Sequence, residues 1–414
     1  KKTILESLKQ GEWGGWHPLF LKWQNLDVPS HARFHVIILD NDGFFRIRLF
    51  YNNLNKFITQ PEGAAEEFNL NVGPMMDFVD NFPPQLIYYP EDRKTFLEEQ
   101  SMTFDWHTKS ISFIKKRYQP DAVIHDIYNP NQMLTSRWWM GYIDPKSARY
   151  NAISETERAK RWQEVKGMYK DLDAMIGEIM KNADENTIIV LSSDHGAIPW
   201  NKEVRLNNLF AKNGLLKFKI DKNTGEPIVD WKNSTVIYLQ MDNIYINANG
   251  LAGNYSRSSG KEYESLRNQV VDLLLSLEDE SGINPVASIT KWEDAPSYLD
   301  LPIDRVGDLV IANKAGYGWD EEMSSDFVIF SEPLASGYKQ AVYPDNEKGM
   351  WTPFIIMGPG IKKGYRLQEP IHHIDQYPTI LHAMRLSIPD FAEGKPIGEA
   401  FETTQNTKSY VVQD

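Results

Sequence analysis

The sequence predicts an α/β fold organised on a doubly wound, mostly parallel sheet, and two neighbouring stretches carry this prediction. Residues 187–196, TIIVLSSDHG, place four branched aliphatic residues in a row, which is typical of a strand buried on both faces. A long amphipathic pattern over residues 154–181 precedes this strand, and a short β-type stretch, DAVIHDIY (121–128), precedes that pattern. A strand, a helix and a second strand joined by a right-handed crossover form the repeating unit of a doubly wound sheet.

The helix expected over residues 154–181 is the clearest element of the chain. Ser154 and Glu157 have the spacing of a capping box, in which side chains satisfy the first free N–H groups of a helix. Apolar residues recur with helical period and predict a buried face made of Trp162, Val165, Met168, Tyr169, Leu172, Met175, Ile176 and Ile179. A second helix is expected over Thr95–Tyr118, because its last residues are basic and Pro120 stops it.

Residues 1–85 predict a small antiparallel β unit. The stretches Arg33–Asp40 and Phe44–Tyr51 are rich in aromatic and branched residues and flank Asn41-Asp42-Gly43, a turn sequence that favours a β-hairpin. The tryptophan-rich opening GEWGGWHPLFLKW (11–23) adds another strand.

Downstream of the Asp-His-Gly motif, residues 204–216 predict a helix and residues 217–335 predict an α+β insertion. The insertion is expected to contain short strands in STVIYLQ and NIYIN, an amphipathic helix at 261–278 and a strand at 308–312. We therefore expect an α/β core in two parts, 86–216 and 336–414, with the insertion between them.

Composition excludes several classes of protein. The chain has 414 residues, of which 57 are acidic and 44 basic, for a formal net charge of −13. This charge argues against a nucleic acid as a bulk partner, because neutralising phosphates requires a basic surface. No apolar run approaches the roughly 18–20 residues of a transmembrane segment. The chain has no cysteine, which excludes disulfides and zinc–thiolate sites within these residues and leaves the compartment open.

Asp194 and His195 are the leading candidate site residues. They follow a predicted parallel strand, and ligands of such sheets bind at the carboxyl ends of the strands. A carboxylate beside an imidazole is a ligand pair for zinc or a similar divalent ion, and Gly196 lets the backbone turn sharply or approach closely. The alternative is a turn in which Asp194 caps the next segment of the chain and His195 is a loop residue with satisfied hydrogen bonds.

Three blocks of sequence extend this interpretation. They are SSDHG after the apolar strand, MWTPFIIMGPGIKKG at 350–364 and IHHIDQYPTILHAMRL at 371–386. In order and spacing they resemble the type I phosphodiesterase/nucleotide pyrophosphatase branch of the alkaline phosphatase superfamily, over roughly residues 86–400. The resemblance implies a sheet of alkaline-phosphatase type, a lid-like insertion, and metal-dependent hydrolysis of a small phosphate ester or nucleotide. It places Asp194 and His195 on a divalent metal, with zinc as the expected ion.

The sequence departs from this family at the second metal. The resemblance implies an aspartate and a histidine four residues apart and a late histidine, but the matching positions here hold Asn131, Thr135 and Lys339. Neutral and cationic side chains do not retain a divalent cation, so we expect one metal, with Lys339 as a fixed positive charge facing phosphate oxygens. The alternative is a catalytically silent relative that serves in binding or assembly.

In related phosphodiesterases, one half of the chain bears the first metal aspartate and the hydroxyl nucleophile. That half has no counterpart here. One interpretation takes VIILDNDG (36–43) as the first metal strand, with Asp42 as a ligand. A hairpin partner, and not a Thr/Ser-Pro nucleophile stretch, follows it. We therefore favour a chain that corresponds to the carboxyl-terminal part of a longer protein, with the nucleophile on an amino-terminal fragment or partner chain.

The loop after residue 128 adds further candidates. Arg137 either clamps a phosphate or pairs with a nearby carboxylate. Trp138 and Trp139 are expected to pack the loop onto the core, with stacking on a base or sugar as the alternative.

Five polar residues near expected strand and helix ends receive structural interpretations. His372 and His373 precede Asp375, which suits the start of a helix, although a histidine there would be a ligand if the helix start lay at the active edge. His125 and Asp126 end the expected 121–128 strand, and we expect them to satisfy loop backbone.

Overall fold

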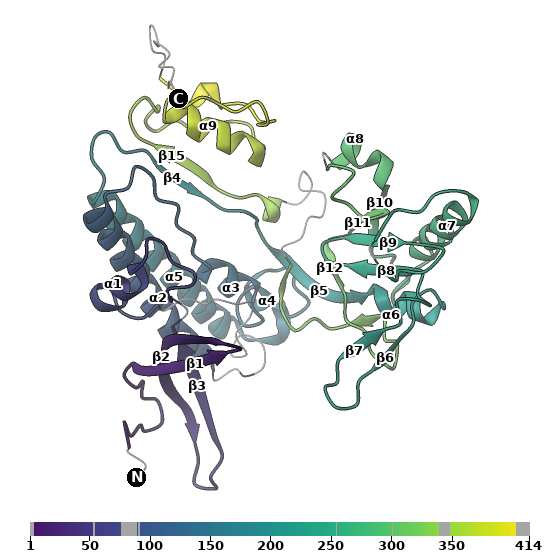
Figure 1. Ribbon diagram of the computed structural model, residues 1–414, viewed down its shortest axis with the longest axis horizontal. Helices are drawn as coiled ribbons and strands as arrows, with labels where there is room; N and C mark the ends of the chain where they lie inside the picture. The colour runs from purple at the N-terminus through teal and green to yellow at the C-terminus, as the bar shows by residue number, and fades with distance from the viewer. Residues whose placement is uncertain are drawn as a thin grey trace.

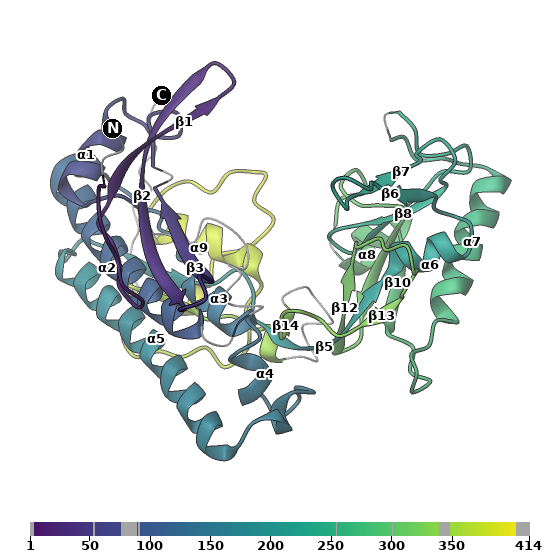
Figure 2. The same ribbon diagram turned by 90° about the horizontal axis from the view of Figure 1, so that it is seen from below.

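The computed structural model describes residues 4–52, 54–75, 89, 92–253, 255–299, 301–338 and 348–402. The architecture is mixed α/β, with five small sheets among these residues. In both ribbon views the chain forms two bodies, one around α2 (Asp92–Tyr118) and α5 (Glu155–Lys181), the other around α7 (Lys261–Leu275) (Figures 1 and 2). Strand β5 (Ile198–Arg205) runs from the first body to the second.

The first body carries the antiparallel sheet predicted near the start of the chain. Its strands are β1 (His17–Trp23), β2 (Leu26–Leu39) and β3 (Phe45–Tyr51), in the order β1-β2-β3. The predicted hairpin is confirmed, because Leu39 pairs with Phe45 across the turn. Arg48 on β3 ties the sheet to α2, since its Nε lies 2.8 Å from Oε1 of the buried Glu99.

Both predicted long helices are present, α2 beginning at Asp92 and α5 at Glu155. The Ser154 side chain accepts a hydrogen bond from the Glu157 N–H at 3.2 Å, which confirms the predicted start of α5. Of the predicted buried face, Val165, Met168 and Met175 lie in the core. Trp162 and Tyr169 are 44% and 49% exposed, so their predicted burial is wrong, because only a narrow stripe of α5 packs against its neighbours.

The predicted doubly wound parallel sheet is not found among the described residues. The motif strand is β4 (Ile189–Ser192), and its one partner in a described ladder is β15 (Phe354–Met357), which runs antiparallel with Ser192 opposite Phe354. The prediction that this strand is buried on both faces is wrong: its residues are half-buried or exposed. A two-stranded ladder cannot cover both faces of a strand, so burial of this apolar run requires further elements.

The predicted strand at 121–128 is also absent. These residues form no strand, and residues 121–124 make no backbone–backbone hydrogen bond within the described part of the chain. Ile124 is fully exposed. The sequence has strand propensity, but no strand of the described residues lies beside it to complete a ladder.

The second body contains the strands and the helix expected within residues 217–335. Its sheet has the antiparallel order β10 (Val286–Lys291), β11 (Leu309–Asn313), β9 (Asn243–Ile246) and β8 (Val236–Leu239). The predicted strands and the helix, observed as α7, are therefore confirmed. The helix expected over 204–216 is shorter, α6 (Leu206–Lys212), because β5 occupies the residues before it.

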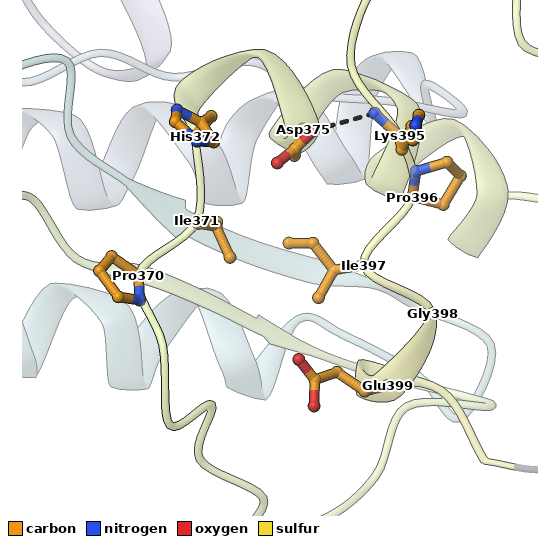
Figure 3. A pocket seen from close by; sticks show the side chains of 9 residues that line it. All are labelled: Pro370, Ile371, His372, Asp375, Lys395, Pro396, Ile397, Gly398 and Glu399. Atoms are coloured by element: carbon orange, nitrogen blue, oxygen red, sulfur yellow. Dashed lines mark hydrogen bonds between the residues drawn. The ribbon is translucent and has the colours of Figure 1, made fainter.

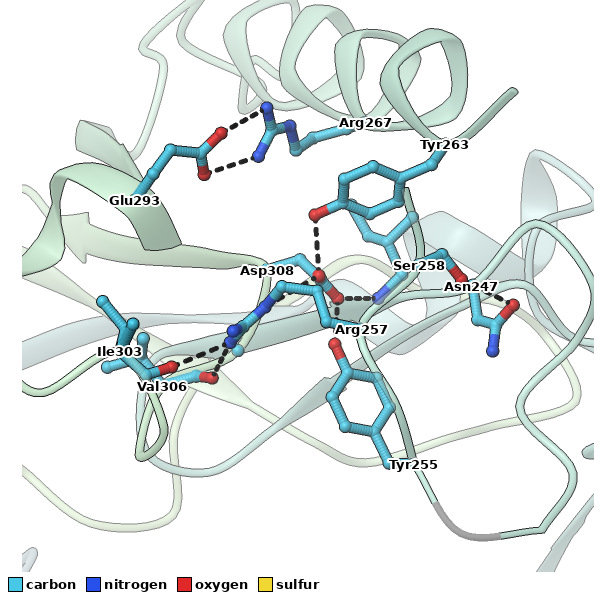
Figure 4. Close-up of polar contacts among 12 residues, drawn as sticks. Asn247, Tyr255, Arg257, Ser258, Tyr263, Arg267, Glu293, Ile303, Val306 and Asp308 are labelled. Atoms are coloured by element: carbon cyan, nitrogen blue, oxygen red, sulfur yellow. Dashed lines mark hydrogen bonds and ion pairs between the residues drawn. The ribbon is translucent and has the colours of Figure 1, made fainter. Parts of the chain in front are cut away.

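A buried carboxylate organises one side of this second body (Figure 4). Asp308 has no exposed surface and accepts hydrogen bonds from the hydroxyls of Tyr255 and Tyr263 and from the Ile246 N–H. The Arg257 guanidinium lies 3.4 Å from the same carboxylate. These contacts fasten the segments before α7 and before β11 to the sheet.

Strand β5 is the link between the two bodies. β12 (Gly316–Asp320) pairs with it in parallel, whereas β13 (Phe330–Ser331) and β14 (Gly337–Tyr338) pair antiparallel. The remaining elements with bounds needed below are α3 (Asn129–Thr135), α4 (Met140–Ile143), the 3-10 turn η5 (His373–Asp375) and α9 (Gln376–Ala383). None of the helices in the described ranges is long and apolar enough to cross a membrane.

Candidate functional site

Asp194 and His195 lie in the turn between β4 and β5. Nε2 of His195 is 3.5 Å from Oδ2 of Asp194, and the two side chains are 23% and 86% exposed. The other ring nitrogen, Nδ1, lies 2.7 Å from the carbonyl oxygen of Gly196. A carbonyl oxygen only accepts, so Nδ1 carries a proton, and Nε2 is the ring nitrogen that faces the carboxylate.

This pair fits a metal ion. Two ligands of one tetrahedral zinc, each about 2.0–2.1 Å from the ion, lie about 3.3 Å apart, close to the observed 3.5 Å separation. The hydrogen bond from Nδ1 fixes the ring orientation, as is usual for a metal-binding histidine. Within the described residues no third carboxylate or imidazole joins this pair within 4.8 Å. The pair therefore offers half of a four-coordinate donor set.

Gly196 explains how the turn is held. Its N–H donates to the Met350 carbonyl at 3.1 Å, and the next N–H, of Ala197, donates to the Gly349 carbonyl at 2.9 Å. A Cβ on Gly196 would stand 2.0 Å from the Gly349 oxygen. A glycine is therefore required where the motif backbone contacts residues 349–350.

The structure places Asn131 and Thr135 on α3, one helical turn apart. The Thr135 hydroxyl donates to the Asn131 carbonyl at 2.7 Å. Oδ1 of the Asn131 side chain is buried without a hydrogen-bond partner. The Thr135 carbonyl accepts from the Ser336 N–H at 3.1 Å, which joins α3 to β14. Lys339 lies outside the described residues; the residue before it, Tyr338, pairs with Ile198 of β5.

Both predicted groups thus flank the start of β5. Asp194 and His195 directly precede this strand, and Ser336, which contacts Thr135, binds it through a 2.8 Å hydrogen bond from Trp200 N–H to its carbonyl. No contact among the described residues joins Asp194 or His195 directly to Asn131 or Thr135.

Arg137 pairs with no carboxylate in the described part of the chain. Its guanidinium lies over the Trp138 ring at 5.5 Å, and its Nε is buried without a partner. Trp138 and Trp139 are buried, and Trp139 Nε1 donates to Glu164 at 2.9 Å. Both tryptophans therefore pack the loop onto the core, which leaves Arg137 as the cation of this loop.

Two residues that the sequence patterns did not indicate complete this region. The Ser336 side chain is buried, and its Oγ accepts from Arg149 Nη1 at 2.9 Å. Arg149 also binds Glu332, with its Nε 2.9 Å from Oε1. No motif or periodicity indicates Ser336 or Arg149, because their partners lie 183 and 187 residues away in sequence.

The two histidines before α9 occupy different surroundings. His373 Nε2 lies 2.8 Å from the Thr352 hydroxyl, whereas His372 lines a shallow cavity of about 460 Å³ (Figure 3). Asp375 holds this region together by accepting a 2.9 Å hydrogen bond from the Lys395 N–H. Asp375 directly precedes α9, as expected, but its side chain makes no capping hydrogen bond to that helix.

The other polar candidates make no contact with Asp194 or His195 among the described residues. His125 Nε2 is 2.7 Å from His107 Nδ1, so the two rings form a pair of their own. Asp126 is exposed in the unpaired segment, and Asp42 is exposed in the turn between β2 and β3.

One cluster of three carboxylates was not predicted from the sequence. Ligand atoms of Glu203, Asp320 and Glu322 lie within 4.8 Å of one another, the single such group among the described residues. Arg205 already pairs with two of them, at 2.7 Å from Glu203 and 2.8 Å from Glu322. The Arg205 guanidinium therefore neutralises part of the negative charge of this cluster.

The sequence matches the family model of type I phosphodiesterase / nucleotide pyrophosphatase over residues 117–335, just over half of the chain. The chain belongs to this family, which is part of the alkaline phosphatase superfamily. Its members are generally metal-dependent hydrolases of phosphate esters. No curated protein matches the sequence.

Among solved structures, the chain is similar to phosphonoacetate hydrolase from Sinorhizobium meliloti 1021. The complex of that enzyme with phosphonoacetate has a TM-score of 0.33 and 12% identity, and the complex with phosphonoformate has a TM-score of 0.29 and 14% identity. Each comparison covers 66% of this chain and 53% of the hydrolase chain. The chain thus matches about half the length of that hydrolase.

Proposed function

We propose that this chain provides the metal-binding part of a phosphodiesterase or nucleotide pyrophosphatase-like hydrolase, with one divalent ion, zinc in the first instance, on Asp194 and His195. The observation that carries the proposal is the 3.5 Å separation between Nε2 and Oδ2. A carboxylate oxygen and a ring nitrogen at this separation match two ligands of one tetrahedral ion. A bound divalent ion would polarise a phosphorus–oxygen bond and favour deprotonation of a coordinated hydroxyl.

The substrate proposed for this site is a small phosphate ester or nucleotide. Asn131 and Thr135 replace the ligands of a second metal with neutral groups, so the remaining phosphate charge requires a fixed cation. We assign that role to Arg137, which has no carboxylate partner in the described ranges, and to Lys339. An arginine binds two phosphate oxygens at once, which also orients the ester.

The nucleophile and the missing donors would come from an amino-terminal fragment or partner chain. The half-complete donor set supports this source, as do the unpaired residues 121–124 and the half-buried strand β4. Such a partner would add strands beside them and complete the doubly wound sheet, with residues 86–216 and 336–414 as its two parts and 217–335 as a lid. Residues 1–85 would remain a separate β unit.

Zinc analysis and an activity assay test the proposal. The purified chain should bind zinc, and Asp194→Ala should lose it, while Asp126→Ala, a change at an exposed aspartate, should not. The isolated chain should not hydrolyse a chromogenic phosphodiester, because no hydroxyl nucleophile of the family's type lies in it. Unchanged zinc content in Asp194→Ala would overturn the metal assignment. Hydrolysis by the isolated chain would overturn the partner source and make Asp42 the next candidate ligand.

A second candidate function is a catalytically silent binding or assembly protein. The neutral Asn131 and Thr135 positions favour it, because they remove the ligands of one catalytic metal. Zinc binding without hydrolysis in the presence of the amino-terminal partner would support this function over the first.

A further inference from the structure

We infer that His373 is a positioning residue for the Asp194–His195 pair and acts through Thr352. The inference rests on the proposed metal site. It begins from the backbone contacts that join residues 192–197 to residues 349–354.

Backbone contacts hold the motif on both sides. Ser192 pairs with Phe354 at the end of the ladder, and four residues beyond Ser192 the Gly196 N–H donates to the Met350 carbonyl. Asp194 therefore lies between these two contacts on one segment, and Thr352 lies between them on the facing segment.

Thr352 in turn is held by η5. Its Oγ1 lies 2.8 Å from His373 Nε2, an interaction that spans 21 residues. Beside it the Ser192 hydroxyl donates to Oε1 of Gln376, at the start of α9, with a distance of 2.6 Å. The two contacts join β4 and the segment before β15 to the same helix start.

The helix start is itself rigidly anchored. The Thr379 hydroxyl, fully buried on α9, donates to the Asp375 carbonyl at 2.5 Å and accepts from the Ile397 N–H at 3.0 Å. A Cβ on Gly394 would stand 2.0 Å from the Ile374 carbonyl oxygen, so the chain after α9 closes tightly over η5. The 3-10 turn that carries His373 is therefore held in place by these contacts.

This arrangement matters because Asp194 is 86% exposed and no hydrogen bond to another residue restrains its carboxylate within the described residues. Its position depends on its backbone, and that backbone depends on the ladder that Thr352 and His373 brace. Residues that orient metal ligands in this way typically change metal affinity by about 10–100-fold when removed.

The test measures zinc affinity by competition with a chromophoric chelator. His373→Ala and Thr352→Val should each weaken zinc binding by about tenfold. The double variant should bind zinc no more weakly than either single variant, because both substitutions remove the same hydrogen bond. His373→Gln, whose Nε2 retains a donor for the threonine, should recover most of the affinity. His372→Ala is the matched control and should bind as the unchanged chain does.

The outcomes separate this inference from the proposed function. Three results would overturn the inference: wild-type affinity in His373→Ala, additive losses in the double variant, or no recovery in His373→Gln. Zinc loss in Asp194→Ala would still uphold the metal site in each case. Failure of the unchanged chain to bind zinc would overturn both. If His373→Ala does not fold, as judged by circular dichroism, Thr352→Val and His373→Gln decide the result.

Discussion

Gly196 packs so closely against Gly349 that a Cβ on the first would stand 2.0 Å from the carbonyl oxygen of the second. The contact is between backbones, so no side-chain rotation relieves it. Gly196→Ala should therefore displace the turn that carries Asp194 and His195 and weaken zinc binding at least tenfold, as measured by chelator competition. Gly177→Ala is the control, because nothing lies within 4 Å of an added Cβ there. It should leave zinc affinity unchanged and stabilise the chain by about 0.5–1 kcal/mol.

Metal stoichiometry is the second prediction. Asn131 and Thr135 offer no anionic or imidazole ligand, so the protein should bind one zinc per chain. Anomalous scattering from zinc-soaked crystals should show a single peak at Asp194 and His195. Two peaks about 4 Å apart would contradict the prediction and indicate a two-metal centre.

The third prediction concerns the buried Asp308. Asp308→Asn places an amide N–H₂ among groups that already donate, the hydroxyls of Tyr255 and Tyr263 and the Ile246 N–H, and removes the charge opposite Arg257. The loss should be about 2–4 kcal/mol of unfolding free energy, measured by urea denaturation. Asp304→Asn, at a side chain that is 76% exposed and 3.8 Å from Arg305, should change stability by less than about 0.5 kcal/mol. Equal effects of the two substitutions would refute the role of the buried network.

Stability should also depend on pH through Asp242. Burial raises the pKa of this carboxyl to about 7, above the unfolded value of about 3.9. The folded chain then keeps a proton that the unfolded chain releases, so the free energy of unfolding should fall as pH rises from about 4 to 7 and level off above that. Burial also raises the pKa of Asp320, to about 6, which adds a fall of the same sign.

Asp242→Asn separates the two carboxyls. Asparagine suits the positive φ of 63° at this position, so the variant should fold. It should lose the fall between pH 6 and 7 and keep about half of the slope between pH 4 and 6, which belongs to Asp320. Asp173→Asn, at an exposed position on α5, should keep the full slope. An unchanged slope in Asp242→Asn would show that this carboxyl does not titrate as stated.

Local patterns in the sequence predicted the elements whose hydrogen bonds and contacts come from residues close in sequence. The hairpin of β2 and β3 follows from a turn between two β-type stretches, and α5 follows from a capping box and a 3.6-residue period, both of which are properties of neighbouring residues. The strand at 121–128 and the two-sided burial of β4 were wrong because each requires strands from elsewhere, which no local pattern supplies.

The candidate site divides in the same way. Asp194, His195 and Gly196 form a contiguous motif that is recognisable in the sequence. Ser336, Arg149 and the contact of Thr352 with His373 depend on side chains brought together by the ladder and by β14. Periodicity and spacing do not encode such contacts.

The unpaired stretch at 121–124 has a consequence for experiments in solution. Its amides have no backbone acceptor in the described chain, so they should exchange with deuterium as fast as those of a free peptide, although they lie between two well-packed helices, α2 and α3. Proteases should nick the isolated chain there. Protection of these amides, appearing only when an amino-terminal fragment is added, would serve as a binding assay that requires neither metal nor substrate.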